Sequence, residues 1–507
     1  MSIARQPRVR DFRRSHYDVA IVGAGMGGLS AAALLSRAGA RVLVLEAMHS
    51  PGGCASSYEK SGGIFDVGAT TLSGTGLGQP LAELFARIGP FDELLPTDPP
   101  MGIHLDGEWI TRFRDRDAWL HEAERTFEQP MREFWNAIAT YSDAAYALLA
   151  RLPFLPPQNI RETAAIIPYL SLDWLRRAPR LLAPVSRWMR RCRVDSDRFR
   201  RFVDAQLLIT SQARAADVPF LAGALGLSYP DYPLHSVRGG MIRYARFLAD
   251  RATESGADVA YLQRVTAIEQ RGTGWRLRTV THRDVEARTV ITDIPIFNLP
   301  DVTDGAVRTH FQGVVGQIRH RGVRLWGAFT IYALVERSLG AGLPVNLQVI
   351  LDSPLRYTGS TTLFLTFSHP DDDTRAPEGL RTLSISTHLD PGHAARPVTR
   401  GEYQGWKNAA EQEIFIALRT QIPEFQDMHV HHSQAGTPRT FRKYTGRADG
   451  LVGGLPLDRR LFPFHYPRPG TPFDGLYCLG DTVFPGQGLP GVTLAALALT
   501  KRLGVGQ

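Results

Sequence analysis

The chain has 507 residues, of which 43% are apolar and 21% charged, and it carries a formal net charge of +8. This length and composition exclude a disordered chain and indicate a globular protein with two intertwined domains. No apolar run reaches the roughly 18 residues that a membrane-spanning helix needs. The positive charge accompanies no recognisable nucleic-acid module, so we exclude a nucleic-acid partner.

The N-terminal residues 1–16 are predicted to be a basic, flexible leader. Five arginines lie in this stretch: Arg5, Arg8, Arg10, Arg13 and Arg14. No apolar segment follows them, which excludes a secretory signal. A membrane or targeting arm is the alternative interpretation.

The segment 17–46 has the order of a nucleotide-binding unit. "YDVAIVG" is a continuous apolar run, typical of a buried parallel strand. A glycine-rich turn and an apolar helical stretch that ends at Gly39 follow, and then a second strand, "RVLVLE", that ends in Glu46. This is GxGxxG in the strand–turn–helix–strand context that a dinucleotide site requires.

Each residue of this motif has a separate physical role. Gly23 permits the tight turn, Gly25 allows the backbone to approach a diphosphate, and Gly28 lets the helix pack closely on the sheet. The N-terminus of the helix offers unpaired N–H groups and a positive dipole end to the phosphates. Glu46 can accept hydrogen bonds from both ribose hydroxyls. We therefore predict a dinucleotide site.

The residues after Glu46 distinguish the nucleotide. A second glycine pair, Gly52 and Gly53, is followed by Cys54 and, later, by "FDVG" at 65–68. Here the chain resembles the FAD-dependent amine oxidases, phytoene desaturases and related flavoproteins. In that group the glycine pair forms a second loop over FAD, which implies that Gly52, Gly53 and Cys54 bind the cofactor. An arginine usually occupies the position where this chain has Cys54. The resemblance implies FAD as the cofactor.

The three cysteines add a constraint. Cys54, Cys192 and Cys478 are scattered without CxxC or Cys/His spacing. This excludes a disulfide framework and a structural zinc site, and it indicates a reducing compartment. We therefore expect no metal site and a cytoplasmic location.

An arginine-rich amphipathic segment lies at 171–201, with ten arginines against three aspartates. Val185, Trp188, Met189 and Cys192 share one helical face, and arginines occupy the other side. One interpretation is a helix that lies on an anionic membrane surface with its apolar face in the lipid. The other is a solvated arginine face over an apolar stripe that packs inside the protein.

Two later stretches return to the cofactor. The resemblance implies that a strand near Val265 contacts the adenine end of FAD. It also implies that "ARTVITDIPIFNLPD" contains the strand after which the chain leaves for the substrate domain. "GLYCLGD" is predicted to be a last strand, with Gly480 and Asp481 at its end and the carboxylate on the ribityl hydroxyls. An ordinary strand-to-helix connection is the alternative.

A Gly/Pro turn then leads into a final helix whose N-terminus is expected to face the isoalloxazine ring. A helix dipole there would stabilise negative charge on the reduced ring. Four residues of this turn are predicted to bind the flavin: Leu489, Pro490, Gly491 and Val492. The two glycine-rich signatures would then enclose one cofactor.

Three further blocks are similar to the branch of carotenoid desaturases, carotenoid isomerases and retinol saturases. They are "FRRFVDAQLLITSQARAADVPFLAGALGLSYPDYPLHSVRGG", "GTPRTFRKYTGRADGLVGG" and "GDTVFPGQGLPGV". The resemblance covers the chain from about Tyr17 to the final helix. It implies a hydrophobic polyene or isoprenoid substrate, which in turn favours peripheral association with a membrane and a membrane-facing mouth within 150–201.

The predicted activity is that of an FAD-dependent oxidoreductase that adds or removes hydrogen across C=C bonds by hydride transfer at flavin N5. A redox-neutral cis/trans isomerase that uses reduced FAD, and a retinol-saturase-like reductase, stay open as alternatives. Two hypotheses lie outside polyene chemistry. One is a non-catalytic lipid carrier like the GDP-dissociation inhibitors, and the other is a soluble amine oxidase. The intact flavin segments at both ends argue against the carrier.

We assign no catalytic residue from the sequence, because no His/Asp or Cys/His constellation stands out. His235, His431, His432 and His465 are interpreted as surface or capped histidines. Asp217 is the first acid to consider near a substrate, although a turn-capping role before a proline is favoured.

The predicted fold class is α/β. A Rossmann-like FAD-binding domain with a parallel sheet and flanking helices is interleaved with a substrate domain of mixed sheet and helices. The FAD-binding domain is assigned to 17–90, 236–296 and 440–507. The substrate domain is assigned to 91–235 and 297–439.

Overall fold

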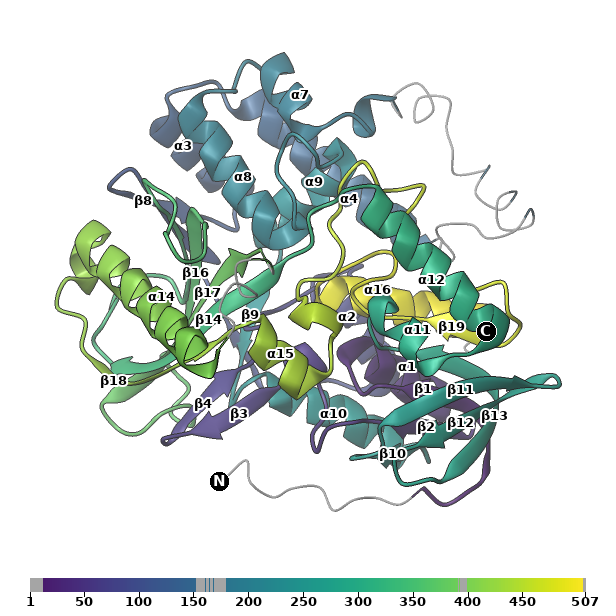
Figure 1. The fold of residues 1–507 in the computed structure, drawn as a ribbon. Helices are drawn as coiled ribbons and strands as arrows, with labels where there is room; N and C mark the ends of the chain where they lie inside the picture. The colour runs from purple at the N-terminus through teal and green to yellow at the C-terminus, as the bar shows by residue number, and fades with distance from the viewer. Residues whose placement is uncertain are drawn as a thin grey trace.

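The computed structural model describes residues 12–151, 179–390 and 399–504, together with the single positions 160, 164, 167 and 392. Most of the predicted leader, and much of the predicted membrane-facing part at 150–201, therefore lie outside the described residues. Figure 1 shows an α/β fold with two large sheets and a separate group of helices. The predicted fold class is confirmed.

The first sheet is mixed and has the strand order β10-β2-β1-β13-β12-β11, with β19 paired to the second half of β13. Five of its strands are parallel to one another: β1 (His16–Val22), β2 (Val42–Leu45), β10 (Asp258–Ala260), β13 (Asp284–Thr292) and β19 (Leu476–Cys478). Two form an antiparallel extension: β11 (Val265–Arg271) and β12 (Gly274–Thr279). Continuous apolar runs such as "VLVL" in β2 occur because both faces of the central strands are covered.

Helices from distant parts of the chain cover this sheet. Against one face pack α1 (Met26–Arg37), α2 (Pro80–Ile88), α10 (Met241–Glu254) and α16 (Leu489–Arg502), and α1 contacts the other three. The apolar core on the other face includes residues of α12 (Gly305–His320), which follows the short α11 (Leu299–Val302). The first and last helices of the described chain are therefore neighbours.

The second sheet has the order β18-β14-β17-β16-β15-β7-β8 and is antiparallel except for the pair β15 and β7. Its strands are β7 (Met101–Leu105), β8 (Glu108–Arg112), β14 (Gly327–Glu336), β15 (Asn346–Ile350), β16 (Thr362–Phe367), β17 (Leu380–Leu389) and β18 (Val430–Gly436). The long helix α14 (Arg400–Gln421) packs its apolar side on this sheet. The helix α15 (Pro438–Thr445) follows β18 directly.

Two small sheets connect the halves. One has the order β5-β9-β6, and the other is the hairpin of β3 and β4. Their strands are β3 (Ser57–Lys60), β4 (Gly63–Asp66), β5 (Leu72–Ser73), β6 (Leu94–Pro96) and β9 (Leu234–Val237). The hairpin is tied to the second sheet because the Arg375 guanidinium donates to the Ile64 carbonyl and to the Asp66 carboxylate.

A group of helices stands beside the second sheet (Figure 1). It consists of α3 (Arg116–Phe127), α4 (Arg132–Arg151), α7 (Val185–Arg191), α8 (Asp197–Ser211) and α9 (Phe220–Leu227). Aromatic rings fill the space between them, with Trp119 edge-on to Trp135 at 5.1 Å. The buried Arg112 guanidinium lies 4.3 Å from the centre of the Trp119 ring and pairs with Asp231. Aromatic packing and this paired charge fix the helical group.

The apolar face of α7 packs inside the protein, which corrects the interpretation that it lies in lipid. Val185 and Met189 are fully buried, and Cys192 is buried as well. The Trp188 ring stacks on Phe220 with centroids 4.1 Å apart. The arginines of α7 face outward. The predicted amphipathic helix is therefore present, but its apolar face is covered by a protein core and not by a bilayer.

Among the described residues, no helix combines the length and the apolar character that crossing a bilayer requires.

Candidate functional site

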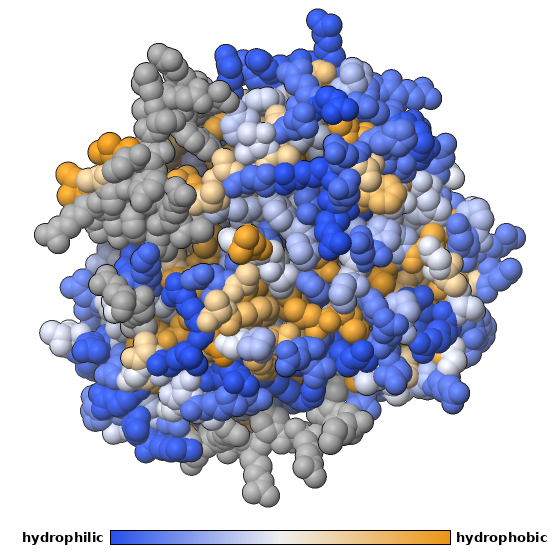
Figure 2. All heavy atoms as spheres, turned by 180° about the vertical axis from the view of Figure 1, so that it is seen from behind, coloured by the Kyte–Doolittle hydropathy of each residue, from blue (hydrophilic) through white to orange (hydrophobic). Residues whose placement is uncertain are grey.

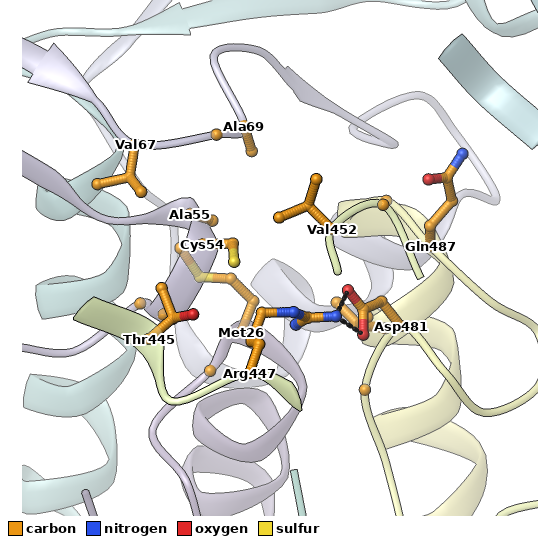
Figure 3. A pocket seen from close by; sticks show the side chains of 18 of the residues that line it. Met26, Cys54, Ala55, Val67, Ala69, Thr445, Arg447, Val452, Asp481 and Gln487 are labelled. Atoms are coloured by element: carbon orange, nitrogen blue, oxygen red, sulfur yellow. Dashed lines mark hydrogen bonds and ion pairs between the residues drawn. The ribbon is translucent and has the colours of Figure 1, made fainter. Parts of the chain in front are cut away.

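A cavity of about 1190 Å³ opens between the first sheet, the second sheet and the helical group. Ligand pockets usually enclose about 300–1,000 Å³, so this cavity is larger than a typical ligand pocket. The predicted site residues from the two chain ends line it together, with Gly25 and Asp481 both in the wall. Figure 3 shows the part of the wall where Met26, Cys54, Arg447 and Asp481 face one another.

The turn after β1 forms one end of the cavity. Gly23 has a φ of +102°, a conformation that favours glycine. Gly23 and Gly25 line the cavity, whereas Gly28 does not. A Cβ on Gly28 would lie 2.7 Å from the Gly23 carbonyl oxygen, so this glycine allows close packing of α1 on the turn. The three glycines thus occupy different positions, one of them outside the cavity wall.

Glu46 lies at the end of β2, buried and facing the cavity. Its carboxylate accepts hydrogen bonds from the Ala24 and Met48 N–H groups, each at 2.7 Å. Burial raises the pKa of Glu46, and the two N–H donors oppose that shift. The carboxylate is therefore held rigidly at the edge where it could accept ribose hydroxyls.

The second glycine pair folds over the first turn. The Gly52 N–H donates to the Ala24 carbonyl at 2.8 Å, and a Cβ on Gly53 would lie 4.0 Å from the Gly25 Cα. The Cys54 side chain also lines the cavity. Burial raises the pKa of the Cys54 thiol, and the neighbouring Arg447 guanidinium opposes that shift. The position after the glycine pair therefore does have a neighbouring arginine side chain, but this arginine is Arg447, from the C-terminal part of the chain.

The C-terminal signature closes the same cavity. Gly480, Asp481 and the first residues of α16 (Leu489, Pro490, Gly491 and Val492) all line it, as does Val265 of β11. A Cβ on Gly27 would lie 3.5 Å from the Val492 Cβ and 3.6 Å from the Gly480 nitrogen. The two signatures, more than 400 residues apart in sequence, are thus in contact.

Two charged residues of the cavity wall were not predicted as site residues from the sequence. Arg447 donates to both oxygens of Asp481 at 2.8 and 3.0 Å. Although burial alone would lower the pKa of Arg447, the Asp481 carboxylate raises it above its usual value. The "RKYTGR" part of the late block carried this arginine, but no spacing pairs it with an acid 34 residues later.

Asp293, the second missed residue, follows β13 and points into the glycine-rich turn. Its carboxylate accepts from the Gly28 N–H at 2.8 Å, and Cβ atoms on Gly25 and Gly27 would lie within 3 Å of it. The pKa of Asp293 is raised to about 7, and burial is the largest cause. Asp481 and Glu46 also act to raise it, while the Gly28 N–H and Arg447 act to lower it. Near neutral pH the Asp293 carboxyl group is therefore protonated in part of the molecules and charged in the rest.

The rest of the cavity extends toward the second sheet and the helical group. The lining residues from the described parts of α4, α8 and α9 carry no formal charge: Tyr146, Leu149, Ile209, Thr210, Ala222, Leu225 and Gly226. His388 of β17 lies in the wall, and its Nε2 is 3.1 Å from the Gln212 Oε1. Burial lowers the pKa of His388 to about 4, so the ring is neutral at physiological pH.

The histidines singled out in the sequence lie elsewhere. His431 and His465 are exposed, and neither they nor His235 and His432 line the cavity. Asp217 lies in the turn before α9, where its N–H donates to the Arg214 carbonyl, and it does not line the cavity either. The turn position is the one that its sequence context favoured.

Comparison with known proteins identifies the family. Residues 26–387, well over half of the chain, match the profile described as flavin containing amine oxidoreductase. The chain belongs to this family. Family membership confirms FAD, the cofactor predicted from the sequence. It also confirms that the protein is an enzyme, a flavin-containing oxidoreductase.

Two relatives match this chain over nearly its whole length. The chain is 24% identical to the chloroplastic prolycopene isomerase of Arabidopsis thaliana, over 97% of this chain and 84% of that protein. It is 21% identical to the 4,4'-diaponeurosporene oxygenase of Staphylococcus haemolyticus, over 96% and 97% of the two chains. The resemblance stated from the sequence motifs is confirmed.

Solved structures share the fold. An oxidoreductase from Methanosarcina mazei superposes with a TM-score of 0.63 at 17% identity, over 95% of this chain and 99% of that chain. Wild-type putrescine oxidase bound to putrescine gives a TM-score of 0.61 at 16% identity, over 96% and 99%.

The residues present fit FAD. The cavity-lining glycines at 23, 25 and 27, the Glu46 carboxylate and the Gly52–Gly53 loop together form a backbone cradle of the kind that a diphosphate and ribose require. Asp481 and the start of α16 line the same cavity, next to Gly27. When bound there, FAD would supply the hydride-transfer chemistry.

Proposed function

We propose that this flavoenzyme acts on the conjugated double bonds of a hydrophobic polyene or isoprenoid, adding or removing hydrogen across C=C bonds. The observation that carries the proposal is the uncharged extension of the cavity, which runs from the cofactor cradle to α4, α8 and α9. A polyene offers no charge to recognise, so an apolar channel is the appropriate complement. The carotenoid-related relatives support the same substrate class.

The chain's own residues would mainly position such a substrate. The apolar wall excludes water and restrains a long, stiff molecule against the cofactor cradle, and orientation of this kind accounts for much of the rate of an enzyme. Neutral His388 and its partner Gln212 could hold a polar end of the substrate or a single water molecule by hydrogen bonds. No strong acid–base pair is required, because a developing cation is delocalised along the polyene.

A second candidate is the redox-neutral cis/trans isomerase. It is supported by the prolycopene isomerases, which match this chain over 96–97% of its length. A retinol-saturase-like reductase would use the same cavity in the opposite redox direction. An amine oxidase is disfavoured, since the lining residues from the described parts of α4, α8 and α9 include no carboxylate to hold an ammonium group.

Anaerobic incubation of the FAD-loaded protein with a polyene in liposomes tests the proposal. Removal of hydrogen from the polyene would bleach oxidised FAD in step with the change in the polyene spectrum, whereas addition of hydrogen requires FAD that was reduced beforehand and would return it to the oxidised form. Isomerisation would change the retention time of the polyene without net bleaching. Reduction of FAD by a simple diamine such as putrescine, with no change in any polyene, would refute the proposed substrate class.

A variant of the channel wall separates substrate access from cofactor binding. Leu225→Trp adds a large ring to a residue of α9 that lines the uncharged part of the cavity. We expect full flavin content and at least about a tenfold loss of polyene turnover, because the ring fills the channel. The matched control is Ile416→Trp on the exposed side of α14, which should behave as wild type. Equal turnover by both variants would place the substrate elsewhere.

We also propose that the protein works at the cytoplasmic surface of a membrane, since such a substrate dissolves in lipid. Leu77 is fully exposed in the loop between Ser73 and Pro80, two residues that line the cavity. Figure 2 shows apolar residues gathered across the middle of one face, with hydrophilic residues around them. An exposed apolar patch of this kind often marks a contact surface.

A liposome assay tests this location. Leu77→Asp is expected to reduce co-sedimentation with anionic liposomes several-fold, because a charge at the loop tip opposes insertion into the interface. The control is Ile416→Asp, an equally exposed substitution on α14. Equal sedimentation of the two variants would count against contact through this loop.

A further inference from the structure

A cluster of two histidines and a glutamate lies at the outer edge of the second sheet. His429 directly precedes the edge strand β18, His431 lies within it, and Glu336 is the last residue of the paired strand β14. Residues two apart in extended chain project to the same side. β18 is at the edge of the sheet, away from β1 and α1 (Figure 1). The cluster is therefore separate from the cofactor cradle.

The ligand atoms of the three side chains converge. The His431 Nε2 lies 2.6 Å from the Glu336 Oε1 and 3.3 Å from the His429 Nδ1. One such atom from each residue lies within 4.8 Å of the others. In a tetrahedral site with metal–ligand bonds of about 2.0–2.1 Å, ligand atoms are about 3.3–3.4 Å apart. The two histidines already have this spacing, and the carboxylate needs only a small outward shift.

The side chains can make that shift, since His431 and Glu336 are 36% and 48% exposed. A single proton on the His431 Nε2 can satisfy the glutamate or the other histidine, but not both in good geometry. A cation would satisfy all three lone pairs at once. The rings already stand nearly perpendicular, at 86°, with centroids 4.5 Å apart.

We propose that Glu336, His429 and His431 form a surface binding site for a borderline divalent transition-metal cation such as Zn²⁺. Two imidazoles and one carboxylate suit Zn²⁺, Cu²⁺ or Ni²⁺ and do not suit Mg²⁺ or Ca²⁺, which prefer oxygen ligands alone. Three protein ligands leave a fourth position for water. The cysteine spacing predicted no metal site. This cluster contains no cysteine, and no local spacing relates Glu336 to His431, which follows 95 residues later.

The position of the site indicates what the cation would do. β18 continues from His431 into Gln434, Ala435 and Gly436, which line the cavity, and then into α15. A cation would tie the start of this edge strand to β14 and so stabilise a segment that forms part of the cavity wall. Because a cation that binds only the folded state stabilises it, thermal unfolding should shift upward.

The test uses tag-free FAD-loaded protein, treated with EDTA and titrated calorimetrically with ZnCl₂. We expect one Zn²⁺ per chain, at least tenfold weaker binding by His431→Ala and by Glu336→Gln, and no binding of Mg²⁺. Zn²⁺ should raise the Tm of the wild type by about 2 °C and leave that of His431→Ala unchanged. Unaltered flavin absorbance verifies that each variant is folded.

The matched control is His320→Ala, which removes an exposed histidine of α12 outside the cluster and should bind Zn²⁺ as the wild type does. Equal Zn²⁺ affinity of the wild type and His431→Ala, or equal affinity for Mg²⁺ and Zn²⁺, would overturn the proposal. Neither outcome depends on which substrate the enzyme uses.

Discussion

Gly28→Ala is expected to yield protein that has lost most of its flavin. The added Cβ would lie 2.7 Å from the backbone oxygen of Gly23 and 2.9 Å from an oxygen of Asp293. A backbone oxygen cannot rotate away, so α1 must shift relative to the turn that forms the cofactor cradle. Overpacking of this kind costs about 1–3 kcal/mol, which corresponds to roughly 5- to 150-fold weaker binding if the strain falls on the FAD-bound form.

The flavin-to-protein absorbance ratio after gel filtration, and titration of the apoprotein with FAD, would measure this effect. Gly313→Ala is the matched control, because a Cβ there meets nothing within 4 Å and alanine favours the helix α12. We expect the control to retain FAD fully. Wild-type FAD affinity in Gly28→Ala would show that the close packing of α1 on the turn is not needed for the cradle.

Asp293→Asn is expected to remove a pH dependence of FAD binding. The pKa of Asp293 is raised to about 7, mainly by burial. The carboxyl group is therefore mostly protonated below pH 7 and becomes charged as the pH rises through that value. FAD brings a negative diphosphate toward the same glycine-rich turn, so it binds the protonated form better. Affinity should accordingly fall as the pH rises above about 7.

With a pKa of about 7 the carboxyl group is half charged at pH 7 and almost fully charged at pH 8.5, so a decrease in affinity of up to about 16-fold is expected between these two pH values. Asparagine keeps an oxygen that can accept from the Gly28 N–H but cannot ionise, so Asp293→Asn should show a flat profile over this range. Fluorescence titration of each apoprotein with FAD at four pH values from 6 to 9 would measure both profiles. Parallel profiles for the two proteins would refute a role for this proton.

The same group affects stability without the cofactor. Its folded-state pKa is raised above the value of an unfolded aspartate, about 3.8. The native apoprotein therefore holds a proton that the unfolded chain has released, and it loses stability as the pH rises from about 4 to about 7. Asp293→Asn should lack this loss, which thermal unfolding of the apoprotein can detect.

Local spacing was sufficient to predict the cofactor end of the protein. The strand, turn, helix and second strand at 17–46 are contiguous, and the roles of Gly23, Gly25 and Glu46 follow from the backbone geometry of such a unit. The C-terminal residues 480–492 were assigned by resemblance, and the structure brings them to the same cavity. The sequence could determine these features because each depends on residues that are neighbours in the chain.

The features that it could not determine depend on residues that are distant in the chain. The Gly28 N–H reaches an acid 265 residues away, and Arg447 and Asp481 approach only when β19 pairs with β13 and the late segment folds across the cavity. The apolar stripe at Val185 and Met189 is compatible with contact to lipid or to a protein core. Only the tertiary structure shows that a protein core covers it. Periodicity records which side of an element is apolar or charged, whereas the partner of that side is set by tertiary contacts.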